Sequence, residues 1–455
     1  MRGRIEESLS EQYTVLSYPK LINNYHRMFQ EMMWANKAHA IMLYDVGVND
    51  LETSKDILSA VGEIQKTLKE GDLAIEKGDD LYLNVEHAIR SKAGGEKGGK
   101  LHIGRSRNDL YSCLSRMVVR KDLWDTMDLT IELQETLLLM AKEHTDSVMT
   151  GYTHMQPAQP TTLAHYLTSY ISVLSRDFNR MRECYVVTNI NPLGGAAFAG
   201  TGFPLDRQQT TNLLGFDAML VNTWDGVASR DFIMQAEAAY AIMQNTLSRF
   251  AQDLYIWCTN EFAMWDLGGQ VSGQSSIMPQ KKNPSALEEV KANSSSGLSA
   301  FTASFASLKN ASFSFVLDEF NLDVDFASAQ KSMTQALRMI MEIIKYSSFN
   351  KERALRMSEK NFCTVTGLAD YLVREYNVSF RDAHHITGGM VADAVKAGLD
   401  VTGMDMASAK KWTKEILGKE LALTDGEVKR ELEPIRNIAS KQVVGGPSKT
   451  RVEEM

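Results

Sequence analysis

The side chains best suited to chemistry lie in a segment rich in Gly, Ser and Lys, GGQVSGQSSIMPQKKNPS (268–285). Its hydroxyl, ammonium and amide groups come from Ser275, Ser276, Lys281, Lys282 and Asn283. With the backbone N–H donors of the segment, these groups could hold a dicarboxylate and stabilise a developing anion. A solvated loop with incidental lysines has the same composition, so composition alone leaves both interpretations open.

A second polar segment is AGGEKGGKLHIGRSRND (93–109), in which Ser106, Arg107 and Asn108 come just before a long predicted helix. A Ser or Asn at this place either caps the helix or helps the helix N-terminus to bind an anion. The residue types do not separate these two roles.

A third polar segment is MTGYTHMQPAQPTT (149–162), which carries Thr153 and His154. A lone histidine is more often structural than catalytic. Functional side chains nevertheless concentrate in loops that a rigid scaffold holds. We therefore keep this segment as a candidate beside the other two.

The sequence predicts no metal site and no cofactor site. No spacing resembles a zinc site, a P-loop or a dinucleotide fingerprint. The four cysteines are far apart in the chain and lie in apolar or helix-like surroundings: Cys113, Cys184, Cys258 and Cys363. They are predicted to be buried free thiols.

The elements that position the three segments are predicted to be long helices, because of where the nine prolines fall. None lies within 20–156, 205–278 or 285–433. Proline breaks helix interiors, so these intervals are free to form long helices. Near 346–355 the pattern gives way to shorter helical segments.

Apolar periodicity supports the same interpretation. One stripe follows Phe232, Ala236, Ala239, Met243, Leu247, Phe250, Leu254 and Trp257. Two others follow Val119, Leu123, Met127 and Ile131, and Phe326, Met333, Leu337, Ile340 and Ile344. Such spacing marks one face of a helix. Stripes of this width indicate helices buried on more than one side, as in the middle of a bundle.

The overall charge excludes some partners. With 57 acidic and 49 basic residues, the formal net charge is -8, which gives no general attraction to nucleic acid or to an anionic membrane. No apolar run approaches the roughly 20 residues that span a bilayer, and the N-terminus lacks a secretory signal. We expect a cytoplasmic protein.

The motifs together resemble a known family. QSSIMPQKKNP is similar to the GSSxMPxKxNP signature of the fumarase/aspartase superfamily. Within that superfamily, LHIGRSRND, GYTHMQPAQPTT, PLGGAAFAGTGFPLDR and LADYLVREYNVSFRDAH resemble argininosuccinate lyase. The motifs occur in the family's order from about residue 93 to 451.

The resemblance implies an all-α fold and a homotetramer whose active sites each combine loops from three subunits. It implies three helical regions: an N-terminal domain (1–98), a central long-helix bundle (99–345) and a small C-terminal domain (346–455). The implied reaction is an anti β-elimination that releases fumarate from an N-substituted aspartate, a small-molecule substrate.

The resemblance also assigns roles. Ser275 would be the general base, and Lys281 and Asn283 would hold the carboxylate that gains charge. His154 would protonate the leaving nitrogen, or orient the group that does so, with Glu288 as its charge partner. The remaining substrate contacts would come from Ser106, Arg107, Asn108, Thr153, Gln156 and Arg230.

The chain departs from the family where argininosuccinate lyases bind the arginine half of the substrate. The family's Tyr, Gln and Lys in AYNxDxQEDK align, without gaps, with Phe315, Phe320 and Asp323. The N-terminal FNxSIxYD segment is replaced by YTVLSYPKLINNYH (13–26), and the leading Gly of the signature is Gln274.

Three functions follow as alternatives. The departures favour a lyase for another amine, with Asp323 either meeting a cationic amine or capping a helix in water. The long motifs also fit a genuine argininosuccinate lyase of arginine biosynthesis. A non-catalytic, crystallin-like protein would share the ancestry, yet the residues predicted for catalysis are all present.

Overall fold

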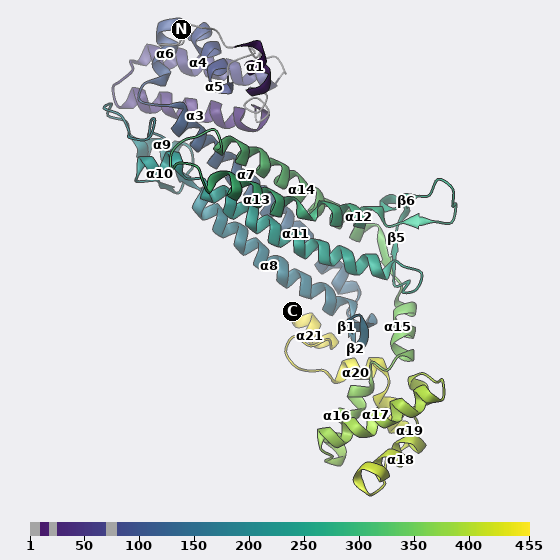
Figure 1. Ribbon diagram of the computed structural model, residues 1–455. Helices are drawn as coiled ribbons and strands as arrows, with labels where there is room; N and C mark the ends of the chain where they lie inside the picture. Colours follow the sequence, from purple (N-terminus) through teal and green to yellow (C-terminus); the bar gives the residue numbers. More distant parts are fainter. Residues whose placement is uncertain (1–9, 18–24, 70–79) are drawn as a thin grey trace. The chain divides into compact units, whose positions relative to one another are not determined.

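The computed structural model describes residues 10–17, 25–69 and 80–455. Helices make up most of this part of the chain, and its strands form only small two-stranded sheets (Figure 1). The predicted all-α fold is confirmed. Half of the N-terminal departure from the family at 13–26, residues 18–24, lies outside the described residues.

The chain divides into two compact units, and four long helices contribute to both. These helices are α7 (Arg107–Glu143), α8 (Leu163–Thr188), α11 (Asp231–Trp257) and α14 (Glu319–Lys345). Unit 1 comprises Met1–Leu129, Asp177–Asn245 and Asn293–Ala336, and unit 2 comprises Thr130–Arg176, Thr246–Ala292 and Leu337–Met455. The division into regions 1–98, 99–345 and 346–455 stays a prediction.

Unit 1 combines parts of the long helices with shorter elements. Its helices are α1 (Glu11–Ser17), α3 (Tyr25–Asp45), α4 (Leu51–Lys69), α5 (Leu81–Ala93), α6 (Gly95–Gly99), η1 (Lys100–His102), α9 (Arg207–Leu213), α10 (Thr223–Ala228), η3 (Asn293–Ser295) and α13 (Ser296–Leu308). The strands β3 (Ile190–Asn191) and β4 (Ala218–Met219) pair in parallel. A core of apolar side chains from α3, α4, α5 and the first turns of α7 holds this part together.

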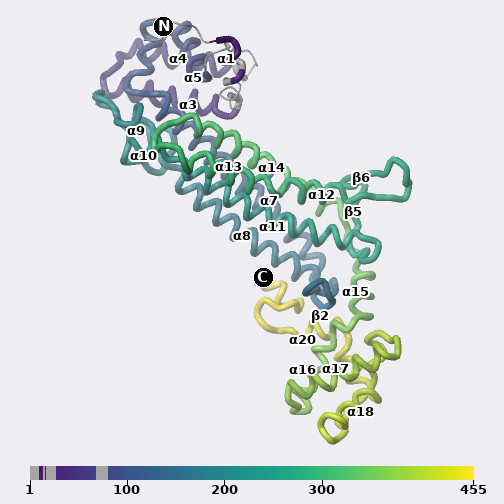
Figure 2. Tube along the Cα trace, in the orientation of Figure 1, coloured from purple at the N-terminus to yellow at the C-terminus, as the bar shows by residue number. Residues whose placement is uncertain are grey.

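Unit 2 carries the hairpins and the C-terminal helices. Its strands are β1 (Val148–Thr153), β2 (Gln156–Thr162), β5 (Trp265–Leu267), β6 (Gly273–Gln274), β7 (Lys282–Asn283) and β8 (Ser347–Phe349). Its helices are η2 (Gly269–Val271), α12 (Ser285–Ala292), α15 (Lys351–Lys360), α16 (Val365–Tyr376), α17 (Phe380–Lys396), η4 (Val401–Gly403), α18 (Met406–Leu417), α19 (Asp425–Glu431), α20 (Pro434–Ser440) and α21 (Lys449–Glu454). The end of the chain, yellow in Figure 2, belongs to this unit.

The predicted long helices are confirmed. All eight residues of the first stripe, from Phe232 to Trp257, are buried along α11. The stripe on α14 is buried as well. On α7 the stripe ends early, because Ile131 is 41% exposed while Leu129 and Leu133 are buried.

Contacts inside each unit pack the long helices together. In unit 1, the Tyr240 ring of α11 stacks on Phe326 of α14 at 5.5 Å, and Thr126 of α7 shares hydrogen bonds with Tyr240 and Gln330. In unit 2, Gln134 of α7 donates to the carbonyl of Ile171 on α8 at 3.0 Å. Within each unit, these contacts hold together the parts of the long helices from which the polar segments extend.

Two of the three polar segments are more regular than expected. Segment 149–162 is a β-hairpin, and 268–285 contains the short β6–β7 pair. The prolines of the first hairpin lie in β2, which is an edge strand because its sheet has only two strands, so they break no central ladder. None of the helices in the described part of the chain is long and apolar enough to cross a membrane.

Candidate active site

The signature segment forms a hairpin in unit 2. Gly273 of β6 pairs with Asn283 of β7, and Gln274 pairs with Lys282. Ser275 and Lys281 each lie one residue beyond the last pair, on opposite arms of the same loop. The hairpin therefore brings Ser275, Lys281 and Asn283 to one place, although the signature spreads them over nine positions of the chain.

The hydroxyl of Ser275 faces backbone donors. Its Oγ accepts hydrogen bonds from the amides of Met278 at 3.0 Å and Ile277 at 3.4 Å. The carbonyl of Met278 in turn accepts from the Lys281 amide at 3.1 Å. Two N–H groups aimed at one oxygen favour a negative charge on it, which is what a serine base requires.

A pocket of about 350 Å³ lies beside this hairpin, lined by Lys281, Lys282, Asp266, Trp265 and Cys258 among others. Lys282 donates to Asp266 on β5 at 2.8 Å. This ion pair ties the base of the hairpin to β5, which pairs with β8. Nothing in the sequence singles out Asp266, since it lies 16 positions from Lys282.

His154 lies at the tip of the β1–β2 hairpin, where Thr153 pairs with Gln156. Both central residues have positive φ, 52° for His154 and 60° for Met155. A two-residue hairpin loop with these angles is a type I′ turn, which usually contains Gly or Asn. The turn directs Thr153, His154 and Gln156 into solvent, and all three are exposed.

Glu288 stands in the first turn of α12, just after the signature segment. Its carboxylate accepts from the hydroxyl of Tyr255 on α11 at 3.1 Å. This bond, within one chain, holds the side chain at the surface of the bundle. The pairing of Glu288 with His154, expected across subunits, stays a prediction.

The second predicted group occupies the start of α7 in unit 1. Ser106 precedes the helix, and its Oγ accepts from the Asn108 amide at 3.3 Å. Asp109 accepts from the Ser106 amide at 2.9 Å. The capping role of Ser106 is thus present, with the S-x-x-D spacing of a capping box. The cap at Ser106 does not decide whether the N-terminus of α7 also binds an anion.

Asp109 organises the segment around the start of α7. It also accepts from the amides of Gly194 and Ala196, at 2.9 and 3.0 Å. Burial raises its pKa to about 6, although these amides and Arg105 favour the charged form. Sequence reasoning missed this residue, although the Ser106-x-x-Asp109 spacing was visible.

Arg107 and Asn108 have partners within unit 1. Arg107 forms an ion pair with Asp80 at 2.8 Å, and Asp80 itself caps α5. The Asn108 amide group donates to the carbonyl of Ala197 at 3.1 Å. Ser106, Arg107 and Asn108 therefore lie together on a segment held at several points.

Arg230 is buried in unit 1. Its side chain is only 2% exposed and forms an ion pair with Glu319 at 2.9 Å, and it also donates to the Ser112 hydroxyl at 2.9 Å. Its contact with a substrate carboxylate stays a prediction, and inside unit 1 the guanidinium already has Glu319 and Ser112 as partners. In the sequence, Arg230 stands just before Asp231, where α11 begins. This position did not indicate that the side chain is buried.

The residues that replace the family's arginine-binding positions gather in unit 1. The Phe315 and Phe320 rings meet edge to face at 5.5 Å. Asp323 is the fifth residue of α14 and accepts from the Ser115 hydroxyl at 2.6 Å. The alternative that Asp323 caps a helix in water is therefore wrong, because the helix begins four residues earlier and the carboxylate has a protein partner.

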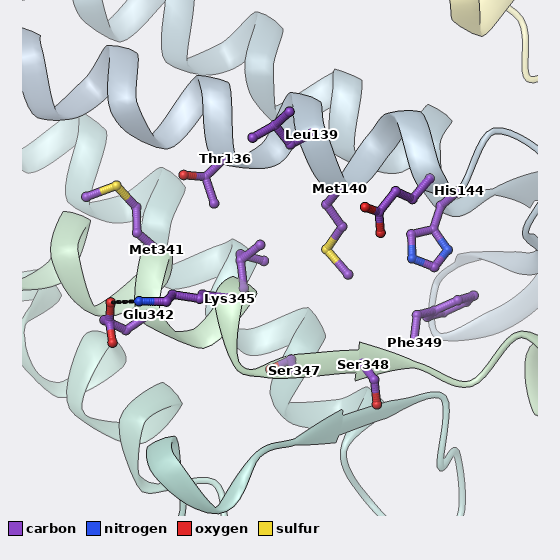
Figure 3. A pocket seen from close by; sticks show the side chains of 12 residues that line it. Thr136, Leu139, Met140, His144, Met341, Glu342, Lys345, Ser347, Ser348 and Phe349 are labelled. Carbon is purple, nitrogen blue, oxygen red and sulfur yellow. Dashed lines mark ion pairs between the residues drawn. The ribbon is translucent and has the colours of Figure 1, made fainter.

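A larger pocket, of about 530 Å³, lies in unit 2 between the ends of α7 and α14 (Figure 3). His144 faces Phe349 there, and Lys345 pairs with Glu342 at 3.7 Å. Burial lowers the pKa of His144, so the ring favours its neutral form. With Glu143 and Glu342 in its lining, this pocket does not suit a dicarboxylate.

The cysteines and possible metal ligands complete the description. Cys113, Cys184 and Cys363 are buried free thiols as predicted, and Cys258 is a half-buried free thiol. Within the ranges that the structure covers, no group of three or more His, Cys, Asp or Glu side chains could hold a metal ion.

Comparisons with known proteins agree with these features. A family model described as lyase matches residues 13–296, and one described as argininosuccinate lyase C-terminal matches residues 362–436. Argininosuccinate lyase 1 of Shouchella clausii is 38% identical over 455 residues, covering 99% of this chain and 91% of its own length. Argininosuccinate lyase of Methanocorpusculum labreanum is 38% identical over 413 residues, covering 90% and 82%.

Solved structures show the same fold. EDDS lyase, in a complex with formate, has a TM-score of 0.85 at 30% identity and covers 99% of this chain and 89% of its own. A variant of EDDS lyase with bound fumarate matches equally well. The class II fumarase of Schistosoma mansoni shares the fold alone, with a TM-score of 0.75 at 16% identity over 90% of each chain.

The fold and the signature hairpin define an enzyme class, the carbon–nitrogen lyases that release fumarate. Within it, the chain belongs to the argininosuccinate lyase subgroup of the fumarase/aspartase superfamily. The predicted family and enzyme class are confirmed.

Proposed function

We propose that this lyase cleaves an N-substituted aspartate whose amine differs from arginine. The observation that carries the proposal is the β6–β7 hairpin, which places Ser275, Lys281 and Asn283 on one loop, while Phe315 and Phe320 replace polar residues of the family's arginine side. The half of the site that would bind the succinyl group is retained, and the amine half is rebuilt.

Ser275 begins the reaction as an alkoxide. It takes a proton from the carbon beside a carboxylate, and the electron pair of that C–H bond moves into the carboxylate, which becomes a doubly charged aci-carboxylate. The amides of Met278 and Ile277 support the alkoxide before the transfer. Lys281 and Asn283 then stabilise the new charge; one such preorganised donor contributes about 3–4 kcal/mol in measured enzymes.

The C–N bond breaks in the second step. The electron pair returns from the carboxylate to form the C=C bond of fumarate. The nitrogen leaves with the electron pair of the C–N bond. His154, with Glu288 as charge partner, delivers or orients the proton that the leaving amine takes up. Ser106, Asn108, Thr153 and Gln156 hold the carboxylates throughout, with Arg107 beside them.

Several copies of the chain supply one site in this proposal. The groups lie on three separate segments: the start of α7, the tip of β1–β2 and the β6–β7 loop. The tip of β1–β2 and the β6–β7 loop both face solvent in the single chain. Another subunit could therefore pack against them. A homotetramer with sites shared by three subunits is the arrangement that the family resemblance implies.

Genuine argininosuccinate lyase is the second candidate, and the names of relatives at 38% identity favour it. The two candidates share the elimination and differ in the amine. Argininosuccinate itself separates them: turnover at the rate of an ordinary argininosuccinate lyase, followed as fumarate absorbance, would contradict the altered-amine proposal.

Ser275→Ala tests the chemistry common to both candidates. The variant removes the proposed base, and we expect fumarate turnover with an accepted amine to fall by about a thousandfold or more, on the scale of lost catalytic groups. Ser276→Ala is the matched control at the next position and is expected to keep most of the activity. Circular dichroism and sedimentation should be unchanged, and equal activities of both variants would contradict the role of Ser275.

A further inference from the structure

Three aromatic side chains of unit 1 form what we call the aromatic cluster: Tyr111, Phe315 and Phe320. The Phe320 ring meets Phe315 at 5.5 Å and Tyr111 at 5.6 Å, both edge to face. Tyr111 is buried, whereas Phe315 and Phe320 are half-buried against the core of the unit. The two phenylalanines therefore still present ring surface that another molecule or subunit can cover.

The cluster lies next to the proposed carboxylate-binding segment. Tyr111 follows Arg107 by four residues on α7, a spacing that places side chains on the same helix face about 5–6 Å apart. Both are tied to the start of α5, because Arg107 pairs with Asp80 and the Tyr111 hydroxyl accepts from the Tyr82 amide at 3.2 Å. A substrate held at Ser106 and Asn108 thus has aromatic surface nearby.

Two buried charged groups of the described residues near the cluster, Asp323 and Arg230, have protein partners. Asp323 accepts from Ser115, and the positive charge of Arg230 favours the charged form of its carboxylate. Arg230 in turn pairs with Glu319 inside the unit. A cationic group on the amine would therefore meet phenylalanine rings and, at Asp323, a carboxylate that already accepts a hydrogen bond from Ser115. A cation over an aromatic ring gains only a modest attraction, while a charge buried without a partner loses its hydration.

We propose that the amine released by this enzyme is apolar, an alkyl- or arylalkylamine without a second charged group, and that Phe315 and Phe320 determine this specificity. The inference rests on the proposed function and names the substrate class of the same site. Apolar surface buried against the rings contributes roughly 25 cal/mol per Å². The role considered for Asp323, meeting a cationic amine, is replaced by contact with the rings.

Addition of amines to fumarate tests the inference. Pentylamine and 1,5-diaminopentane have the same chain and reacting nitrogen and differ in a terminal methyl or ammonium group. With purified enzyme and saturating fumarate, we expect kcat/KM for pentylamine to exceed that for the diamine by about tenfold or more, as expected for one mismatched group. Loss of fumarate absorbance and mass spectrometry of the N-alkyl aspartate give the rates. A preference for the diamine, or for arginine over both, would overturn the inference.

Substitutions locate the preference. Phe320→Gln and Phe315→Tyr restore the family's residue types and should each reduce the ratio several-fold, while the KM for fumarate stays nearly constant. Phe320→Leu should keep the ratio and guards against a packing defect. Phe380→Gln, on an exposed ring of α17, is the matched control. If Phe320→Gln changes the ratio no more than Phe380→Gln does, the assignment is wrong.

The same assay separates failure of the inference from failure of the proposed function. An enzyme that adds cationic amines but not apolar ones remains a fumarate-forming lyase, and only the inference is lost. If fumarate is neither consumed with any amine nor formed from argininosuccinate, the proposed elimination is wrong and the inference falls with it.

Discussion

Glu237 of α11 is a carboxylic acid in the interior of unit 1. Its side chain has no exposed surface. One oxygen accepts from the Ser304 hydroxyl at 3.0 Å, and the other has no hydrogen-bond partner. Burial, with the charges of Asp325 and Asp323, raises its pKa to about 8. We infer that the folded chain carries this residue as a neutral acid near pH 7.

Glu237→Gln should remove a pH dependence of stability. The folded pKa of about 8 lies above the ordinary value of 4.5, so between these values the folded chain binds more protons and the free energy of unfolding falls as pH rises. The loss is at most about 1.4 kcal/mol per pH unit. Thermal unfolding midpoints should match near pH 4.5 and separate by about 2–5 °C in favour of the variant by pH 9.

The control for this measurement is Glu352→Gln, which changes a side chain that is 84% exposed. It should shift the midpoint equally at every pH. A difference between Glu237→Gln and the original protein that stays constant from pH 5 to pH 9 would show that Glu237 titrates in the same range in both states.

At the scale of elements, the hairpin that carries His154 contains an unfavourable turn. His154 and Met155 both adopt left-handed backbone angles, which cost an ordinary residue roughly 1–2 kcal/mol. Side chains with a Cβ persist there when the surrounding structure holds them, often at functional sites. The tip thus gives up stability to direct an imidazole outward.

Met155→Gly should relieve this cost without changing the imidazole. Glycine accepts positive φ, and we expect the thermal midpoint to rise by up to about 1 °C, consistent with a gain below 1 kcal/mol. Turnover should fall several-fold, because a freer turn holds His154 less well. Met155→Leu keeps a Cβ and should change neither property. The same midpoint for the glycine and leucine variants would argue against strain at this tip.

The helices were predictable from the sequence and the hairpins were not. Proline spacing and the stripe from Phe232 to Trp257 identify α11, because helix formation depends on neighbours three and four residues away. The β6–β7 pair has only two residues per strand, too few for a periodic signal. Ser275 was identified by the resemblance of its segment to the family signature, and not by periodicity.

Contacts between residues far apart in the chain could not be predicted from the sequence either. Arg230 and Glu319 are 89 positions apart and gave no sign that they form a buried ion pair. Residue type alone cannot distinguish a cation that faces a substrate from one that neutralises an interior acid, so the sequence could not show the pairing of Arg230 with Glu319. Ile131 was expected to be buried, but it is exposed because α7 presents a second apolar face to solvent.

At the scale of the whole molecule, the second apolar face of α7 fits the proposed homotetramer. Ile131 and Leu138 on α7 are seven residues apart and 41% and 40% exposed, and the adjacent Leu139 is 64% exposed. Apolar side chains repeating every seven residues are typical of a seam that packs against another helix. Another subunit is the partner that the proposed homotetramer provides, and sites shared among subunits are a consequence that can be measured.

Mixed assemblies measure it directly. Ser275→Ala and His154→Asn should each be inactive alone. If one site takes Ser275 and His154 from different subunits, random assembly of equal amounts leaves both residues intact in about a quarter of the sites, because each is intact half of the time. Co-expressed variants should therefore recover about a quarter of the original turnover, whereas variants purified separately and mixed without dissociation should recover none. If both residues came from one chain, no mixture could restore a complete site, and co-expression would yield an inactive enzyme.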